Sequence, residues 1–176
     1  MPSTTIFLLI LPLLLNRALS TNLSPTVSID AGVIIGTTTT LPSATATVNK
    51  YLGIPFAASP TRFAVPVAPA LWDAPLNVTA WKPACVQQFP RISGELSDLL
   101  ADVFYSQAPE ESEDCLYLNV YAPAAPAPHD GRAVMFWIHG GNLQLGTAGD
   151  IFLDGSPFAA YEDIIVVTTN YRMNCR

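Results

Sequence analysis

The clearest fold signal in this 176-residue chain is the stretch Ala133-Val134-Met135-Phe136-Trp137-Ile138-His139-Gly140-Gly141-Asn142. Its first six residues are all apolar, which is typical of a strand covered on both faces in an α/β sheet. Further along, Ile164–Asn170 repeats the buried-strand pattern, and Ser156–Tyr161 is a candidate helix between the two runs. Strand, glycine loop, helix and strand in this order predict the beginning of a doubly wound α/β sheet.

Upstream of this unit the pattern changes to shorter strands. Residues 26–51 are rich in Val, Ile and Thr and contain two turn signals, so they predict short antiparallel strands at the edge of a sheet. Leu116–Tyr121 alternates in polarity and predicts another strand, whereas Ser97–Tyr105 predicts a helical turn or two. Residues 52–86 are predicted to run over the surface, because prolines deny donors to strands and helices. These prolines are Pro55, Pro60, Pro66, Pro69, Pro75 and Pro83.

The charge composition and the N-terminal residues exclude some classes of function and predict where the protein is located. The net charge is −6 and only 12% of residues are charged, with the basic ones scattered, so we expect no nucleic-acid partner. Residues 6–15 form an apolar run followed by Ala18-Leu19-Ser20, which predicts a signal peptide over residues 1–20 and a secreted chain over residues 21–176. A membrane anchor is the alternative, but this run is shorter than the roughly 20 residues that a spanning helix needs, so no stable membrane span is expected.

Secretion makes the cysteines interpretable, because disulfides persist outside the cytosol. Cys85 and Cys115 are the natural partners, and their bridge would close a loop of about 30 residues, worth roughly 3–4 kcal/mol in the chain-entropy model. The alternative is two unrelated buried thiols, and Cys175 is left over in either case. Asn77-Val78-Thr79 is an acceptor pattern for N-glycosylation and predicts that Asn77 lies at the surface; Asn22 begins a second match.

The two successive glycines after His139 carry the chemical prediction. Without Cβ atoms, their backbone N–H groups can point at a bound atom. When an ester carbonyl is attacked, negative charge develops on its oxygen, and each prearranged N–H donor is worth about 3–4 kcal/mol there. A tight turn that needs glycine only for its own geometry is the competing interpretation.

Segments along nearly all of residues 21–176 resemble the type-B carboxylesterase and cholinesterase family. The nine residues Ser112-Glu113-Asp114-Cys115-Leu116-Tyr117-Leu118-Asn119-Val120 are close to a signature of that family. The other resembling stretches are Tyr51–Ala57, Arg62–Pro69, Trp72, Cys85–Gln88, Val134–Asn142 and Asn170–Arg172. The resemblance implies an incomplete N-terminal part of an α/β-hydrolase fold, with short antiparallel edge strands and then the start of a mostly parallel sheet.

The resemblance also implies roles for single residues. It implies backbone oxyanion donors at Gly141 and Asn142, in the loop that includes His139 and Gly140. Asn142 stands where the family usually has a third glycine, which keeps the N–H group but adds a side chain next to the acyl pocket. The structural pairs that it implies are a disulfide between Cys85 and Cys115 and an ion pair between Arg62 and Glu113.

A nucleophile elbow, Gly-x-Ser-x-Gly followed later by an acid and a histidine, does not occur in these 176 residues. The only histidines are His129 and His139, and neither lies where the family places its base. Covalent acyl transfer therefore has no route in this chain alone. We expect residues 21–176 to be the front part of the domain of a secreted carboxylic ester hydrolase, ending before the elbow and inactive alone.

Its expected substrate is a small-molecule or lipid ester, with no cofactor and no metal ion. Two alternatives stay open. One is a non-catalytic, cholinesterase-like binding or adhesion module. The other is a chain that does not fold, because strands without neighbours expose apolar edges.

Overall fold

The structure is a computed structural model that describes residues 24–44, 46–88 and 110–173. The predicted signal peptide, the helical turn predicted at Ser97–Tyr105, Asn22 and Cys175 lie outside these residues. In the described part, no helix is both long enough and apolar enough to span a bilayer.

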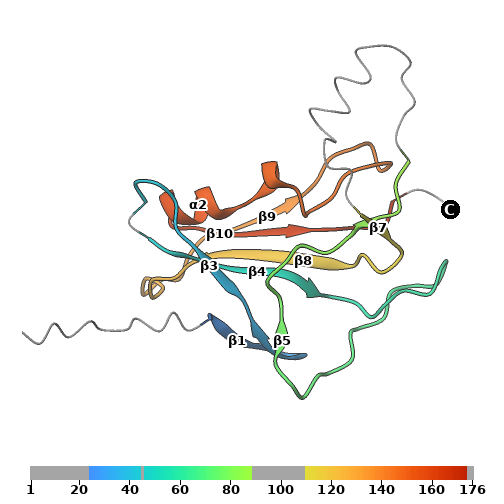
Figure 1. Ribbon diagram of the computed structural model, residues 1–176, viewed down its shortest axis with the longest axis horizontal. Coiled ribbons are helices and arrows are strands. Elements are labelled where there is room, and N and C mark those ends of the chain that lie inside the picture. The colour runs from blue at the N-terminus through green and yellow to red at the C-terminus, as the bar shows by residue number, and fades with distance from the viewer. Residues whose placement is uncertain (1–23, 45, 89–109, 174–176) are drawn as a thin grey trace, which may run out of the picture.

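A five-stranded mixed sheet forms the centre of the molecule (Figure 1). Its strands, in spatial order, are β3 (Thr37–Thr39), β4 (Val48–Pro55), β8 (Tyr117–Pro123), β10 (Ile165–Thr169) and β9 (Val134–Ile138). Strands β9 and β10 are parallel, whereas all other neighbours are antiparallel. The prediction of antiparallel edge strands followed by the start of a parallel sheet is therefore confirmed.

Smaller elements cover the two faces of this sheet. Figure 1 shows helix α2 (Ser156–Tyr161) above it and strands β1 (Thr26–Ile29) and β5 (Leu76–Asn77) below it, where they form a second sheet with β2 (Gly32–Ile35). Helix α2 matches the predicted range. The remaining elements are β6 (Ala84–Cys85), β7 (Glu111–Ser112), which is parallel to β6, and the 3-10 helix η1 (Ile151–Leu153).

Successive side chains of a strand point to opposite faces, so the central strands carry one core layer on each face. A third buried cluster surrounds the disulfide at Cys85 and Cys115. The layer beneath α2 contains Val48, Leu52, Tyr121, Ala159 and Val166. The layer against the second sheet contains Ile34, Tyr51, Ile54 and Val78. Both faces of β4 and β8 are thus buried.

An ion pair fixes helix α2 to strand β4. Lys50 Nζ lies 2.6 Å from Asp154 Oδ2 and 5.5 Å from the centre of the Tyr121 ring. Asp154 also accepts the N–H of Ser156, the first residue of the helix, at 2.8 Å. Burial alone raises the pKa of Asp154. The hydrogen bonds from Lys50 and Ser156 together lower it by more, so this pKa lies below its ordinary value.

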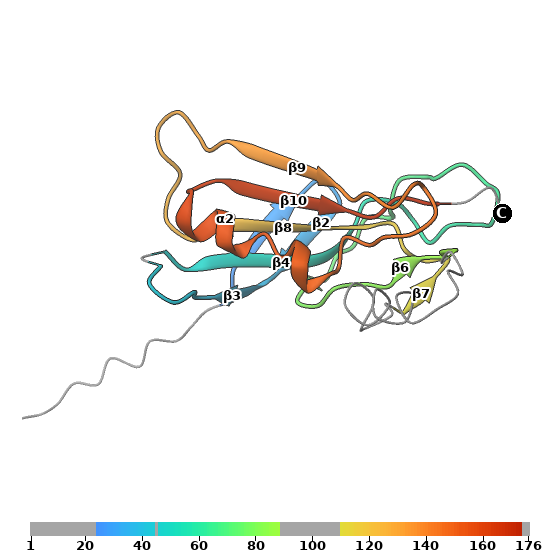
Figure 2. The same cartoon turned by 90° about the horizontal axis from the view of Figure 1, so that it is seen from above.

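The predicted burial of β9 on both faces is wrong for this chain. Val134, Phe136, Trp137 and Ile138 are 60%, 57%, 45% and 62% exposed. Figure 2 shows the reason, since β9 is the outermost strand of the sheet and pairs with β10 alone among the described strands. Met135, by contrast, is partly buried and packs against the core layer beneath α2.

The prediction for residues 52–86 is partly wrong. Most of this segment has no regular structure, but strand β4 continues through Pro55, with Leu52 and Ile54 buried. The ladder ends where Pro55 brings no N–H group, and the next amide, Phe56 N, bonds to Leu116 O at 3.2 Å.

Candidate functional site

The loop His139–Gly146 follows the parallel strand β9 and reverses the chain. Gly141 has a φ of 124°, and Asn142 and Leu143 have φ values of 57° and 58°, in the left-handed region that costs non-glycine residues energy. The carbonyl oxygen of Gly141 accepts the N–H groups of Gln144 at 3.0 Å and Leu145 at 3.2 Å. A Cβ atom on Gly141 would overlap the carbonyl oxygen of Leu145, so this turn requires glycine.

The N–H groups of Gly141 and Asn142 donate to no acceptor within the described part of the chain. An open hollow of about 390 Å³ lies at this loop, lined by residues 138–143 and Tyr171. Asn142 is exposed and Gly141 is half-buried. The loop therefore offers two backbone donors beside a space that a small ligand can enter.

His139 is packed at the end of strand β9 and is 5% exposed. Its ring stacks on Tyr171 with 4.3 Å between ring centres, and the Tyr171 hydroxyl donates to His139 O at 2.9 Å. Burial lowers the pKa of His139, against a smaller opposing effect of its contact with the Gly140 carbonyl. The ring is therefore neutral at physiological pH and serves as packing at the base of the loop.

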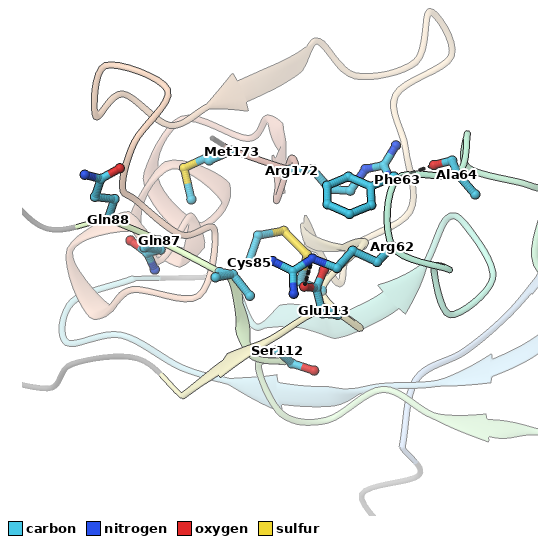
Figure 3. A pocket seen from close by; sticks show the side chains of 12 residues that line it. Arg62, Phe63, Ala64, Cys85, Gln87, Gln88, Ser112, Glu113, Arg172 and Met173 are labelled. Carbon is cyan, nitrogen blue, oxygen red and sulfur yellow. Dashed lines mark hydrogen bonds and ion pairs between the residues drawn. A yellow bond between two sulfur atoms is a disulfide. The ribbon is translucent and has the colours of Figure 1, made fainter. Parts of the chain in front are cut away.

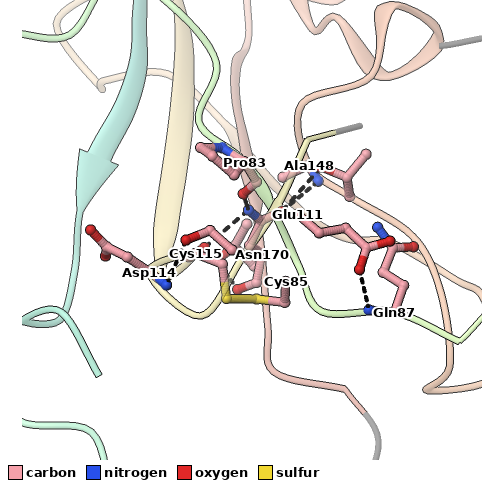
Figure 4. Close-up of a disulfide and its surroundings, with 11 residues drawn as sticks. Pro83, Cys85, Gln87, Glu111, Asp114, Cys115, Ala148 and Asn170 are labelled. Atoms are coloured by element: carbon pink, nitrogen blue, oxygen red, sulfur yellow. Dashed lines mark hydrogen bonds between the residues drawn. A yellow bond between two sulfur atoms is a disulfide. The ribbon is translucent and has the colours of Figure 1, made fainter. Parts of the chain in front are cut away.

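Two hydrogen bonds from outside hold the second half of the loop, and a third holds the chain just after it. Gly146 N donates to Gln87 Oε1 at 2.7 Å, and Gln88 N donates to Gln144 O at 2.8 Å. Just beyond the loop, Ala148 N donates to Asn170 Oδ1 at 2.7 Å (Figure 4). Sequence reasoning assigned no role to Gln87 and Asn170, although both lie in stretches that carried the family resemblance.

Cys85 and Cys115 form a disulfide in the structure, with 4.9 Å between their Cα atoms (Figure 4). Both residues are buried. The carbonyl oxygen of Cys115 accepts the side-chain N–H of Asn170 at 3.0 Å, so the disulfide and the end of strand β10 are in direct contact. Gln87 lies two residues after Cys85 and contacts Gly146, so a short segment connects the disulfide to the glycine loop.

Arg62 and Glu113 lie on the wall of a second pocket, of about 650 Å³, beside the disulfide (Figure 3). Arg62 Nε is 3.5 Å from Glu113 Oε1, and the two side chains are 56% and 49% exposed. Arg172, on the same wall, donates to Ala64 O at 2.8 Å. An exposed ion pair of this kind contributes only about 0–1 kcal/mol to stability.

The other predicted positions lie away from the loop. Asn77 is exposed on strand β5, and Thr79 of the same acceptor pattern is exposed as well. His129 is exposed and contacts Asp130 at 3.2 Å. Among the described residues, no group of three or more His, Cys, Asp or Glu side chains could hold a metal ion.

Comparison with known proteins identifies the family. Residues 23–175 match the carboxylesterase family. Para-nitrobenzyl esterase of Bacillus subtilis is 43% identical over 129 residues, which are 72% of this chain and 24% of that protein. Liver carboxylesterase 1F of Rattus norvegicus is 38% identical over 152 residues, 85% of this chain and 27% of that protein.

The solved structures agree with the sequence comparison. A structure of PNB esterase aligns with a TM-score of 0.68 and 39% identity, covering 85% of this chain and 28% of that one. The chain thus spans about a quarter of the length of the relatives that it matches. By sequence and by structure, the chain belongs to the carboxylesterase family and contains part of its α/β-hydrolase fold.

Proposed function

We propose that this chain supplies the oxyanion-binding loop of a carboxylic ester hydrolase, with the N–H groups of Gly141 and Asn142 as donors. One observation carries the proposal: Gly141 and Asn142 line an open hollow, and their N–H groups donate to no acceptor in the described residues. Membership of the carboxylesterase family and the names of the relatives support ester hydrolysis as the reaction.

The proposed chemistry is stabilisation of charge. Attack on an ester carbonyl converts it to a tetrahedral centre, and its oxygen takes up negative charge. Donors about 2.7–3.1 Å from that oxygen stabilise it, and each contributes about 3–4 kcal/mol. The turn closed on the Gly141 carbonyl holds the loop before substrate arrives, so little reorganisation is needed during the reaction.

The attacking group and its base are expected from polypeptide outside these 176 residues, which contain no Gly-x-Ser-x-Gly. We therefore propose that this chain alone does not hydrolyse esters, because an oxyanion loop stabilises only charge that a nucleophile creates. Small-molecule or lipid esters are the proposed substrates. The exposed side chain of Asn142, beside the hollow, is proposed to limit the size of the acyl group.

We also propose that the protein is secreted and is glycosylated at Asn77. The apolar run at residues 6–15 supports export. The buried disulfide between Cys85 and Cys115 is typical of an oxidising compartment. The exposed position of Asn77 on β5 supports modification there.

An NMR titration tests the oxyanion proposal on the chain itself. The probe is methylphosphonate, a tetrahedral anion. We expect saturable downfield shifts of the amide protons of Gly141 and Asn142, while the amide of Thr168, buried in β10, stays unchanged. The variant Asn142→Gly keeps both N–H groups and should respond as the wild type does. If neither amide responds, the proposal fails.

A second assay tests the inactivity of the chain alone. Purified wild-type chain is mixed with p-nitrophenyl acetate, and release of p-nitrophenol is compared with buffer. We expect no turnover above buffer. Turnover that is lost on denaturation would show that the chain contains its own nucleophile.

A further inference from the structure

We infer that Gln87 is a positioning residue of the oxyanion loop, which it ties to the disulfide-bonded segment 84–88. This inference rests on the proposed function, because it concerns the same two amide donors. Gln87 touches neither of them. It acts on the exit of the loop, at Gly146.

The hydrogen bond between Gln87 and Gly146 is short and has a defined direction. Gln87 Oε1 accepts the backbone N–H of Gly146 at 2.7 Å. Since an N–H group needs an acceptor, the side-chain oxygen of Gln87 must face Gly146, and this fixes the orientation of the amide. Two residues before Gly146, the carbonyl oxygen of Gln144 accepts the backbone N–H of Gln88 at 2.8 Å. Neighbouring residues of one segment thus hold two points of the loop.

The segment that presents Gln87 is itself firmly anchored. Cys85 is buried and bonded to Cys115, and Ala84 N donates to Glu110 O at 2.8 Å. The backbone N–H of Gln87 donates to the side chain of Glu111 at 3.2 Å, as Figure 4 shows. One disulfide bond and two hydrogen bonds therefore hold the segment that presents Gln87 to the loop.

Gly146 is the point where the exit of the loop touches its entry. Its φ is 125°, and a Cβ atom there would overlap the ring of His139 and lie 2.6 Å from the carbonyl oxygen of Gly140. The two stems of the loop are thus in close contact, and a shift of Gly146 moves the residues that lead into Gly141. Without the Gln87 acceptor the Gly146 N–H loses its partner, and the donors are held less firmly.

The test compares Gln87→Met with Gln88→Met. The control removes an exposed glutamine side chain one residue away and keeps the backbone bond of position 88 to the loop. We measure methylphosphonate binding at the amides of Gly141 and Asn142, and hydrogen exchange at Gly146. For Gln87→Met we expect about fivefold weaker binding, close to 1 kcal/mol, and about tenfold faster exchange at Gly146. Gln88→Met should stay within about twofold of wild type in both.

The outcomes separate this inference from the proposed function. If the amide protons of Gly141 and Asn142 in the wild-type chain do not shift with methylphosphonate, both the proposed function and this inference are refuted. A wild-type chain that responds, together with a Gln87→Met chain that binds equally well, refutes the role of Gln87 alone. If Gln87→Met does not fold, Gln87→Glu replaces it, because its carboxylate keeps the acceptor. Exchange at Gly146 should then stay slow, and fast exchange would contradict the inference.

Discussion

Replacement of Asn170 by leucine should destabilise this chain more than any surface substitution. Asn170 is buried at the end of β10, and its side-chain N–H groups donate to the carbonyl oxygens of Pro83 and Cys115, both at 3.0 Å. Its Oδ1 accepts the N–H of Ala148 at 2.7 Å. One side chain therefore joins the end of strand β10, the disulfide segment and the chain just after the glycine loop (Figure 4).

The size of the effect follows from the groups that lose a partner. Asn170→Leu has a similar volume but takes a hydrogen-bond partner from three groups in the interior, the carbonyl oxygen of Pro83, the N–H of Ala148 and the hydroxyl of Thr147. The carbonyl oxygen of Cys115 keeps the N–H of Tyr117, at 2.9 Å. Each unpaired group costs about 1–3 kcal/mol, and burial of the leucine offsets about 2 kcal/mol of the total. We expect a net loss of about 4 kcal/mol in the free energy of unfolding.

Urea unfolding followed by circular dichroism measures this loss, with Asn49→Leu as the matched control. Asn49 is half-buried on strand β4, and its side chain makes no hydrogen bond within the described residues. Its replacement should change the free energy of unfolding by less than about 1 kcal/mol. Equal unfolding midpoints for the two variants would show that the hydrogen bonds of Asn170 do not stabilise the fold.

Three further predictions follow from the packing and the charges. Gly155→Ala should cost about 1–3 kcal/mol in urea unfolding, because its methyl group would lie 2.7 Å from a side-chain atom of β10, whereas Gly140→Ala meets no atom within 4 Å and should cost nothing. The depressed pKa of Asp154, paired with Lys50, stabilises the fold above its unfolded pKa of about 4, and this contribution is lost as the pH falls through the lower folded pKa. Unfolding free energies measured from neutral to acidic pH should therefore fall less steeply in Asp154→Asn than in wild type. Phe136→Lys on the exposed edge strand should raise the monomer fraction in size-exclusion chromatography, and an unchanged profile would show that this edge does not drive self-association.

Local pattern was enough to predict most of the strands and the helix. Alternation at Leu116–Tyr121 marks β8, the β-branched run at Ile164–Asn170 marks β10, and Ser156–Tyr161 is helix α2. Each of these signals depends on residues that are close together in the sequence, so a side-chain period of two or a short helical segment between two strand patterns can be recognised without knowledge of the fold. The apolar run of β9 was also found, but its exposure depends on which strand lies beside it, and the run itself contains no such information.

The parts of the site that sequence reasoning missed depend on partners far apart in the chain. Gln87 meets Gly146 across 59 residues, and Asn170 meets Pro83 across 87. A single glutamine or asparagine carries no periodicity, and its role becomes visible only when the topology brings its acceptor or donor near. The glycine pair was predictable, because two glycines at the end of a strand have few uses other than a tight turn or a ligand contact.

A crystal structure of the chain grown with methylphosphonate tests the oxyanion assignment most directly. We expect one phosphonate oxygen within about 2.7–3.1 Å of both Gly141 N and Asn142 N, in the hollow beside Tyr171. A structure in which those two N–H groups turn into the protein interior, or in which the anion binds elsewhere and leaves them in contact with water, would contradict it.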